Sequence, residues 1–353
     1  MARADLSLPL VVVFILGMGL ATLNSAAPAN EFMRQVVFLL GGLVIIAGLL
    51  WLGKSRIMRA APHVYFVSIG LLLMTRVFGT EVNGAKSWLQ LGPLPGFQPS
   101  ELAKLGLIMM LAVAMHERPI RRLTDYLRIG LIAAPPIGLV VLEPDLGSAL
   151  VLVAIAAGMV VVRGIPWRHL LIIGMVVAVA VPTVVLPNLE DHQRERLITF
   201  LDPAADPRGS GYQVIQSMIA VGSGGLMGKG YMQGTQSQLG FIPYRQTDFI
   251  FPVLAEEGGF VASVALLLLY GLLFWRLFAM AAEAPYDRDQ LVITGVVALI
   301  GFQVLVNVGV TIGLAPVTGI TLPLVSYGGT SLVSTLIALT LAFVVHRDRF
   351  ADW

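Results

Sequence analysis

The sequence predicts an all-α polytopic membrane protein with ten transmembrane helices. Of its 353 residues, 57% are hydrophobic and only 12% are charged, and the mean hydropathy is +0.84. A soluble domain usually carries about 25% charged residues. The charges leave apolar runs between them, each near the ~20 residues that a helix needs to cross a bilayer. Because a bundle in lipid grows by adding spans, we expect residues 1–353 to form a single membrane domain.

The gaps between charges delimit the spans. The ten expected spans are Leu8–Ala26, Val36–Gly53, Ala61–Phe78, Leu102–His116, Leu127–Leu142, Leu146–Val162, Leu170–Leu186, Phe249–Trp275, Leu291–Leu314 and Val325–His346. The last two share one uncharged stretch, which Pro316 and Pro323 interrupt near its middle. The first span also resembles a cleavable signal peptide, but its apolar run exceeds the ~7 to 15 residues of such a segment, so we expect it to remain.

The positive charges predict the orientation, because Lys and Arg of short loops concentrate in the cytoplasm. Only Arg34, Arg76, Lys86 and Lys104 lie on the other side in short loops or span ends. The cytoplasmic set is Arg3, Lys54, Arg56, Arg59, Arg118, Arg121, Arg122, Arg128, Arg163, Arg168, Arg276, Arg288, Arg347 and Arg349. We therefore expect both termini in the cytoplasm.

One long external loop, about residues 187–247, is expected between spans seven and eight. Loops of this length in compact proteins are usually functional or disordered. Within the loop, Gly209–Gly228 is uncharged, and Ile215, Met218 and Ile219 share one helical face with polar residues off it. We predict an interfacial amphipathic helix here, because a further span would move the C-terminal arginines outside.

The composition also excludes several kinds of chemistry. The chain has no cysteine, so disulfides, thiolate metal sites and thiol catalysis are absent. The net charge is only +2, and we expect no nucleic-acid partner.

Polar segments that are far apart in the sequence should meet on the external face. They are Asn83–Trp88, Gln98–Lys104, Glu143–Gly147, the loop residues Asp191, Arg194, Arg196 and Asp248, and Gly313–Gly329. Because the membrane gathers them on one side, a shared external site is the simplest explanation. Trp88 and Tyr327 also suit a role as interface anchors.

Several of these residues have a structural interpretation as well as a functional one. Glu101 and Lys104 lie three residues apart on one helical face, where they can pair. The pair is either neutralising or holds Lys104 ready for an anionic substrate group. Asp145 follows Pro144 in a tight turn, where an acid suits the N-terminus of the next helix.

Three acids near the eighth span raise the same question. Asp248 lies where it can cap the helix, whereas Glu256 and Glu257 lie about two turns inside it and need a partner or an aqueous cavity. Arg194 and Arg196 are candidate partners, and arginines also bind phosphate as bidentate donors. An external cavity with acids, cations and access from lipid suits an amphiphilic phosphate substrate. It fits both an enzyme and a secondary carrier.

The motifs carry a resemblance to a known family. The segments 234–258 (Gly-Thr-Gln-Ser-Gln through Asp248 to Glu-Glu-Gly) and 316–329 (Pro-Val-Thr-Gly-Ile-Thr-Leu-Pro-Leu-Val-Ser-Tyr-Gly-Gly) resemble signatures of the SEDS proteins (shape, elongation, division and sporulation). Asn83–Leu89, Gln98–Lys104 and Glu143–Gly147 fit as well, so the resemblance covers nearly the whole chain. Gly-Thr-Gln-Ser-Gln is similar to the elongation members rather than the division members.

The resemblance implies a peptidoglycan glycosyltransferase that polymerises lipid II on the outer face of the bacterial cytoplasmic membrane, beside a class B penicillin-binding protein. It implies Asp248 as the general base. The residues expected to bind substrate are Glu101, Lys104, Lys86, Arg194, Arg196, Asp145 and Glu257. A divalent cation, Mg²⁺ or Mn²⁺, is also expected, although no ligand spacing identifies its site. The alternative function is a lipid II flippase or another transporter of lipid-linked substrates.

Overall fold

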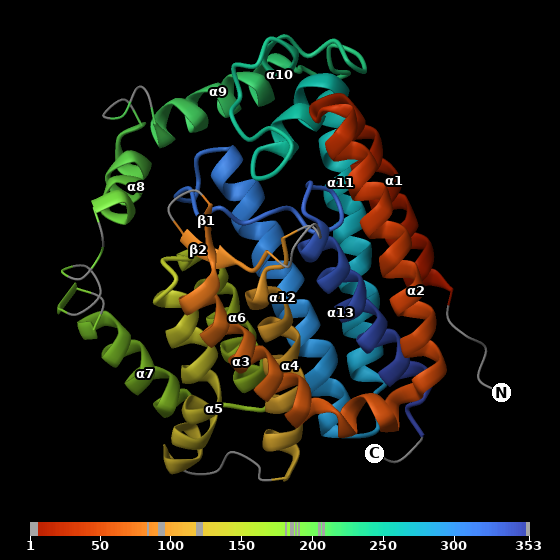
Figure 1. The fold of residues 1–353 in the computed structure, drawn as a ribbon, viewed down its shortest axis with the longest axis vertical. Coiled ribbons are helices and arrows are strands. Elements are labelled where there is room, and N and C mark those ends of the chain that lie inside the picture. The colour runs from red at the N-terminus through yellow and green to blue at the C-terminus, as the bar shows by residue number, and fades with distance from the viewer. Residues whose placement is uncertain are drawn as a thin grey trace.

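Long helices run side by side along the long axis of the molecule (Figure 1). The computed structural model describes residues 6–82, 85–90, 96–117, 123–180, 191–203 and 209–350, together with 182, 183, 187, 189 and 206. The helices are α1 (Ser7–Ala26), α2 (Ala29–Arg59), α3 (Ala61–Phe78), α4 (Pro99–Glu117), α5 (Leu123–Val141), α6 (Leu146–Val162), α7 (Trp167–Ala180), α8 (Asp191–Leu201), α9 (Ser210–Ser223), α10 (Thr235–Gln238), α11 (Ile250–Ala282), α12 (Asp287–Thr311) and α13 (Gly329–Arg347).

The predicted membrane protein is confirmed in its main features. Eight of these helices are long and apolar enough to cross a membrane, namely α1 to α5 and α11 to α13. The sixth predicted span is α6, a shorter apolar helix of 17 residues, and the seventh corresponds to α7, which has 14 residues. The total of ten spans therefore stays a prediction.

A short β-hairpin was not predicted. Strands β1 (Thr80–Val82) and β2 (Ala85–Trp88) pair antiparallel directly after α3. A bridge between Leu89 and Phe97 continues the pairing. This hairpin lies close to the start of α4 (Figure 1).

The helices divide into inner and outer members. In the most apolar 18-residue window of α4, 78% of the residues are buried. In the corresponding window of α2, only 6% of the residues are buried. Outer helices therefore leave large apolar side chains exposed, for example Leu40, Trp51, Phe66 and Leu131. This arrangement is stable because hydrocarbon replaces water as the solvent of those side chains.

Charged residues at one end tie three chain segments together. The Lys54 ammonium lies 3.1 Å from the Asp289 carboxylate, and both side chains are fully buried. The Lys54 amide donates to Asp348 over 3.1 Å. Gly53, at a φ of 73°, turns the chain here, since its left-handed conformation favours glycine. The C-terminus and the turn from α11 to α12 lie at this end, and the hairpin, α9 and α10 lie at the other (Figure 1).

The helix predicted within residues 209–228 is present as α9, and its interfacial position stays a prediction. It has 14 residues and lies across the end of the bundle (Figure 1). Its packed face is not the one expected to be apolar, because Val214, Ser217 and Ala220 are buried while Met218 and Ile219 are exposed. The Ser217 hydroxyl donates to the Thr311 carbonyl over 2.6 Å, which fastens α9 to the end of α12.

Helix α11 is broken at Gly259, where φ is 66°. A Cβ there would lie only 2.3 Å from the Gly228 amide, so the close approach of residues 224–230 requires glycine. The inserted loop satisfies backbone groups that the break frees. The four bonds are Lys229 N to Glu256 O at 2.9 Å, Gly230 N to Glu257 O at 3.0 Å, Phe260 N to Gly225 O at 2.9 Å and Val261 N to Leu226 O at 3.1 Å.

Candidate functional site

A cavity of about 730 Å³ opens at the hairpin end of the bundle. It brings together five of the predicted site residues, which come from four separate parts of the chain: Glu101, Lys104, Asp145, Arg196 and Asp248. Trp88 and Tyr327 also line the cavity, so they face the site and do not serve simply as interface anchors. Parts of all the predicted polar segments therefore meet in one cavity, although Asp191 and Arg194 are not in its lining and Asn83 lies outside the described residues.

Asp248 presents its carboxylate to the cavity from the turn before α11. The helix begins at Ile250 with Phe249 as the N-cap, so the interpretation of Asp248 as the helix cap is wrong. No residue in the described ranges donates a hydrogen bond to this carboxylate. Burial raises the pKa of Asp248 to about 6; the charge of Arg196 lowers it, and that of Asp145 raises it. The result is a partly buried carboxylate that faces the cavity and has a pKa of about 6.

Glu101 and Lys104 form the predicted pair at the floor of the cavity. The Lys104 ammonium lies 2.8 Å from one Glu101 oxygen, and both side chains are almost fully buried. The second oxygen accepts from the Ser334 hydroxyl of α13 over 2.5 Å. Because the carboxylate is satisfied on both oxygens, Lys104 is held in place and keeps donor capacity for an anion.

Asp145 caps a helix and also faces the cavity. One oxygen accepts from the Ser148 amide over 2.9 Å, which caps α6 as predicted. The other accepts from the Gln98 side chain over 3.1 Å, which connects the turn to the segment before α4. Asp145 also lines the cavity.

Glu143 is an unusual acid that the sequence analysis left without a role. Its side chain is 2% exposed, and neither carboxylate oxygen has a hydrogen-bond partner among the described residues. The nearby Thr75 hydroxyl donates instead to carbonyl oxygens of its own helix. Burial raises the pKa of Glu143 to about 7, with Asp145 acting in the same direction. Its position before Pro144 in a short turn was the only signal in the sequence.

Three predicted substrate-binding residues are not brought to the cavity. Lys86, Arg194 and Glu257 are absent from its lining. One Glu257 oxygen accepts from the Ser25 hydroxyl at 2.5 Å and from the Gln238 side chain at 3.2 Å, so this acid fastens α1 to α10. Arg34 and Gln303 do line the cavity, although neither was predicted.

The predicted pairing of Glu256 with Arg194 or Arg196 is wrong. Glu256 is fully buried and accepts five hydrogen bonds from the loop that folds back on the α11 break. Oε1 accepts from Lys229 Nζ at 2.7 Å, Thr235 Oγ1 at 3.2 Å and Gln236 N at 2.8 Å, and Oε2 accepts from Ser237 N and Ser237 Oγ at 3.0 Å each. These five donors, none of which is an arginine of α8, are the hydrogen-bond partners of the Glu256 carboxylate.

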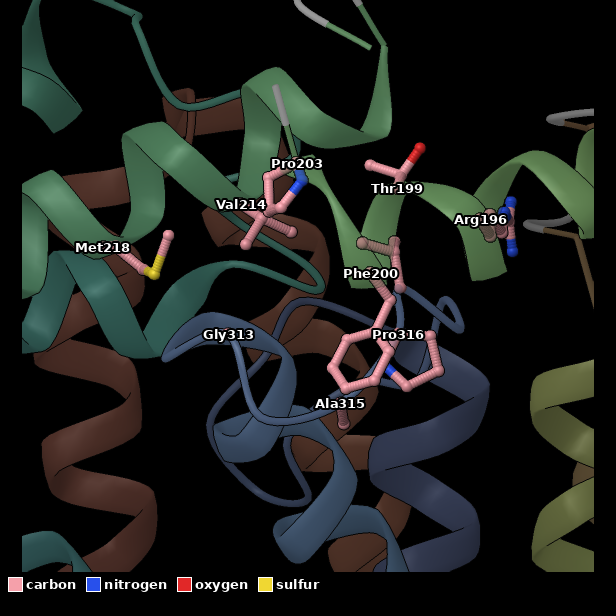
Figure 2. A pocket seen from close by; sticks show the side chains of 10 residues that line it. Arg196, Thr199, Phe200, Pro203, Val214, Met218, Gly313, Ala315 and Pro316 are labelled. Atoms are coloured by element: carbon pink, nitrogen blue, oxygen red, sulfur yellow. The ribbon is translucent and has the colours of Figure 1, made fainter. Parts of the chain in front are cut away.

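A second, small pocket lies between α8, α9 and the segment after α12 (Figure 2). Its lining is mainly apolar and includes Phe200, Pro203, Met218 and Pro316, with Arg196 at the edge (Figure 2). Arg196 lines both this pocket and the large cavity. Helix α8 thus carries a cation whose side chain lies between an apolar and a polar compartment.

The cavity offers carboxylates for the expected cation. No group of three or more His, Asp or Glu side chains in the described ranges is arranged to hold a metal by itself. Mg²⁺ in phosphate sites usually keeps several waters and takes one or two carboxylates plus substrate phosphates. Asp248 and Asp145 face the same cavity, so the side chains present fit that kind of shared site.

Comparisons with known proteins agree with this geometry. The family model for FtsW, RodA and SpoVE, described as a cell cycle protein, matches residues 2–350. Peptidoglycan glycosyltransferase MrdB of Escherichia coli strain K12 is 38% identical over 318 residues, covering 90% of this chain and 85% of the relative. Peptidoglycan glycosyltransferase RodA of Treponema pallidum is 30% identical and covers 91% and 90%, respectively.

Solved structures give the same result. A crystal structure of the rod shape determining protein RodA of Thermus thermophilus is 41% identical, with a TM-score of 0.77 and 99% of each chain covered. A chain from a study of how a peptidoglycan synthase complex coordinates polymerization and crosslinking is 48% identical, with a TM-score of 0.89 over the full length of both. The chain therefore belongs to the FtsW/RodA/SpoVE family, which is the SEDS family that its motifs resemble.

Proposed function

We propose that this chain is a peptidoglycan glycosyltransferase that polymerises lipid II on the outer face of the bacterial cytoplasmic membrane, with Asp248 as general base. Relatives with this activity in their names support the reaction class. The observation that carries the proposal is the Asp248 carboxylate, which faces a cavity that also contains Lys104 and Arg196. The charge pattern of the loops supports cytoplasmic termini.

The geometry supports a direct displacement at the anomeric carbon. The C4 hydroxyl of the acceptor sugar forms the new bond while the bond to undecaprenyl diphosphate breaks. Asp248 takes the hydroxyl proton, since a poor nucleophile needs a base in the transition state. Negative charge grows on the departing diphosphate, and the cations Lys104, Arg196 and Arg34 line the same cavity. Fixed positive groups of this kind stabilise the leaving group.

A divalent cation is part of the proposal. Asp248 would hold it, with Asp145 nearby, and the substrate phosphates and waters would complete its shell. When bound, the cation would supply charge stabilisation for the diphosphate. We expect Mg²⁺ or Mn²⁺ because carboxylate and phosphate oxygens are the ligands these ions prefer.

The pH dependence of turnover follows from the base. Asp248 accepts a proton only when it is ionised, and its pKa is raised to about 6. We expect kcat to be constant at neutral pH and to fall roughly tenfold per pH unit on the acid side. The midpoint should be about 6 at limiting cation and lower at saturating cation, because a nearby positive charge favours the ionised carboxylate. Initial polymerisation rates between pH 5 and 8 at the lowest cation concentration that supports turnover measure this limb, and a rate that stays constant over that range would argue against this base.

The partner and the biological role extend the same proposal. We infer that a class B penicillin-binding protein crosslinks the glycan strands that this chain makes, since one structural relative comes from a study of a synthase complex that joins polymerization to crosslinking. The Gly-Thr-Gln-Ser-Gln segment favours cell elongation over division. Relatives named for rod shape support this assignment.

A lipid II flippase is the second candidate, because a charged cavity among membrane helices also suits a carrier. Labelled lipid II in detergent distinguishes the two functions, since no membrane remains to be crossed. We expect the purified chain, supplied with its partner and Mg²⁺ or Mn²⁺, to yield glycan polymer. The partner alone is the control, and a complete lack of polymer would favour the flippase.

A further inference from the structure

Three successive peptide carbonyls, those of Gln246, Thr247 and Asp248, are held from one side. The donors lie in α12 and in the segment before α13. They are Tyr327 N to Gln246 O at 2.8 Å, Ser326 Oγ to Thr247 O at 2.6 Å, and Asn307 Nδ2 to Asp248 O at 2.9 Å. The two motif segments, 234–258 and 316–329, are thus joined along the peptide that carries Asp248.

Asn307 donates to the peptide carbonyl of Asp248 itself. Its side chain is 2% exposed, and the same Nδ2 atom also donates to the Ile320 carbonyl over 2.8 Å. Its Oδ1 has no hydrogen-bond partner among the described residues, so the side chain serves its two acceptors. An amide inside an apolar membrane helix is costly, and nothing in α12 itself requires one. Its contacts point to the loop that holds Asp248.

Ser326 supports the same loop from a second direction. Its hydroxyl accepts from the Leu322 amide over 2.8 Å while donating to Thr247. The Gln35 side chain of α2 in turn donates to the Ser326 carbonyl over 3.0 Å and accepts from the Gly328 amide over 3.1 Å. These buried polar groups are satisfied together, and such networks fix one backbone arrangement.

We propose that Asn307 is a positioning residue that sets where the Asp248 carboxylate lies, with Ser326 as its support. The direction of a side chain follows from its own peptide, and Asn307 fixes that peptide against the segment 316–328. This inference rests on the proposed role of Asp248 as the general base. A misplacement of about 1 Å can cost about 100-fold in rate, so a group that never touches substrate can control turnover.

The test is the variant Asn307→Leu, which removes both donated hydrogen bonds and keeps the branched shape with the same number of side-chain heavy atoms. We expect kcat to fall about 10- to 100-fold with KM within about threefold of the parent. The split between kcat and KM is the readout of positioning, because a general disturbance of the cavity would also raise KM. Thr311→Val, one turn along α12, is the matched control, since the Thr311 hydroxyl donates only within its own helix to Val308.

Two further variants keep the inference falsifiable. If Asn307→Leu fails to fold, Ser326→Ala takes its place and should show the same change in a milder form. The inference is overturned if kcat stays within threefold, or if KM rises as much as kcat falls, as a general disturbance of the cavity would produce. Asp248→Asn tests the proposed base separately from the positioning role. An active Asp248→Asn would rule out Asp248 as the base. An inactive Asp248→Asn beside a fully active Asn307→Leu would rule out only the positioning role of Asn307.

Discussion

Asp248→Asn should reduce polymer synthesis by at least about 100-fold, the lower range of what a general base contributes. The change keeps the size of the side chain and removes only its ability to take a proton. Folding should be preserved. No described residue donates a hydrogen bond to the Asp248 carboxylate, so replacing the carboxylate with an amide breaks no hydrogen bond of the fold. The measurement is the initial rate of glycan formation from labelled lipid II by the purified variant with its partner.

Glu283→Gln is the control for that experiment. Glu283 lies at the opposite end of the molecule, where it faces His346 and Arg349 at 3.7 Å. Glu283 is itself about half exposed and its two contacts are long, so both rate and stability should be close to those of the parent. If Asp248→Asn keeps a rate comparable to that of the control, the base must be another group.

Glu256→Gln should destabilise the protein strongly. Donors face both oxygens of Glu256, three at Oε1 and two at Oε2. Whichever way the new amide is oriented, its NH₂ group meets donors, and Lys229 loses its counter-charge. Glu256 is fully buried and Lys229 is 26% exposed, so the loss of this pair together with the facing donors costs about 3 kcal/mol, the lower end of the range for buried pairs. We expect a clearly lower Tm in detergent, together with proteolysis of residues 224–240, which this acid fastens to α11.

Glu257→Gln is the matched neighbour. Only its Oε1 accepts hydrogen bonds from described residues, namely Ser25 and Gln238, so the amide can place its oxygen there and its NH₂ on the other side. The free energy of unfolding should change by only about 1 kcal/mol. Equal losses of Tm in the two variants would show that the five-donor arrangement of Glu256 is not what holds the loop.

Much of the fold was predictable because a lipid bilayer strictly limits which residues can lie inside it. Charges cannot lie freely in hydrocarbon, so the gaps between them located the membrane helices. The pair of Glu101 with Lys104 and the capping by Asp145 were also predictable, because both are local contacts set by helical spacing.

The remaining features depend on contacts that no local pattern specifies. The strands of the hairpin have three and four residues, too few to show an alternating pattern. The donors to Glu256 include backbone amides of Gln236 and Ser237, and backbone groups carry no signal of side-chain type. Asn307 was overlooked because one polar residue in an apolar helix does not reveal which distant carbonyls it holds.

The most direct test is a side-by-side measurement in one detergent preparation. Wild-type protein and Asp248→Asn, each with its partner and Mg²⁺ or Mn²⁺, are given labelled lipid II at pH 7.5. The account predicts glycan strands from the wild type and essentially none from Asp248→Asn at equal amounts of folded protein. Polymer from both proteins, or from neither, would contradict it.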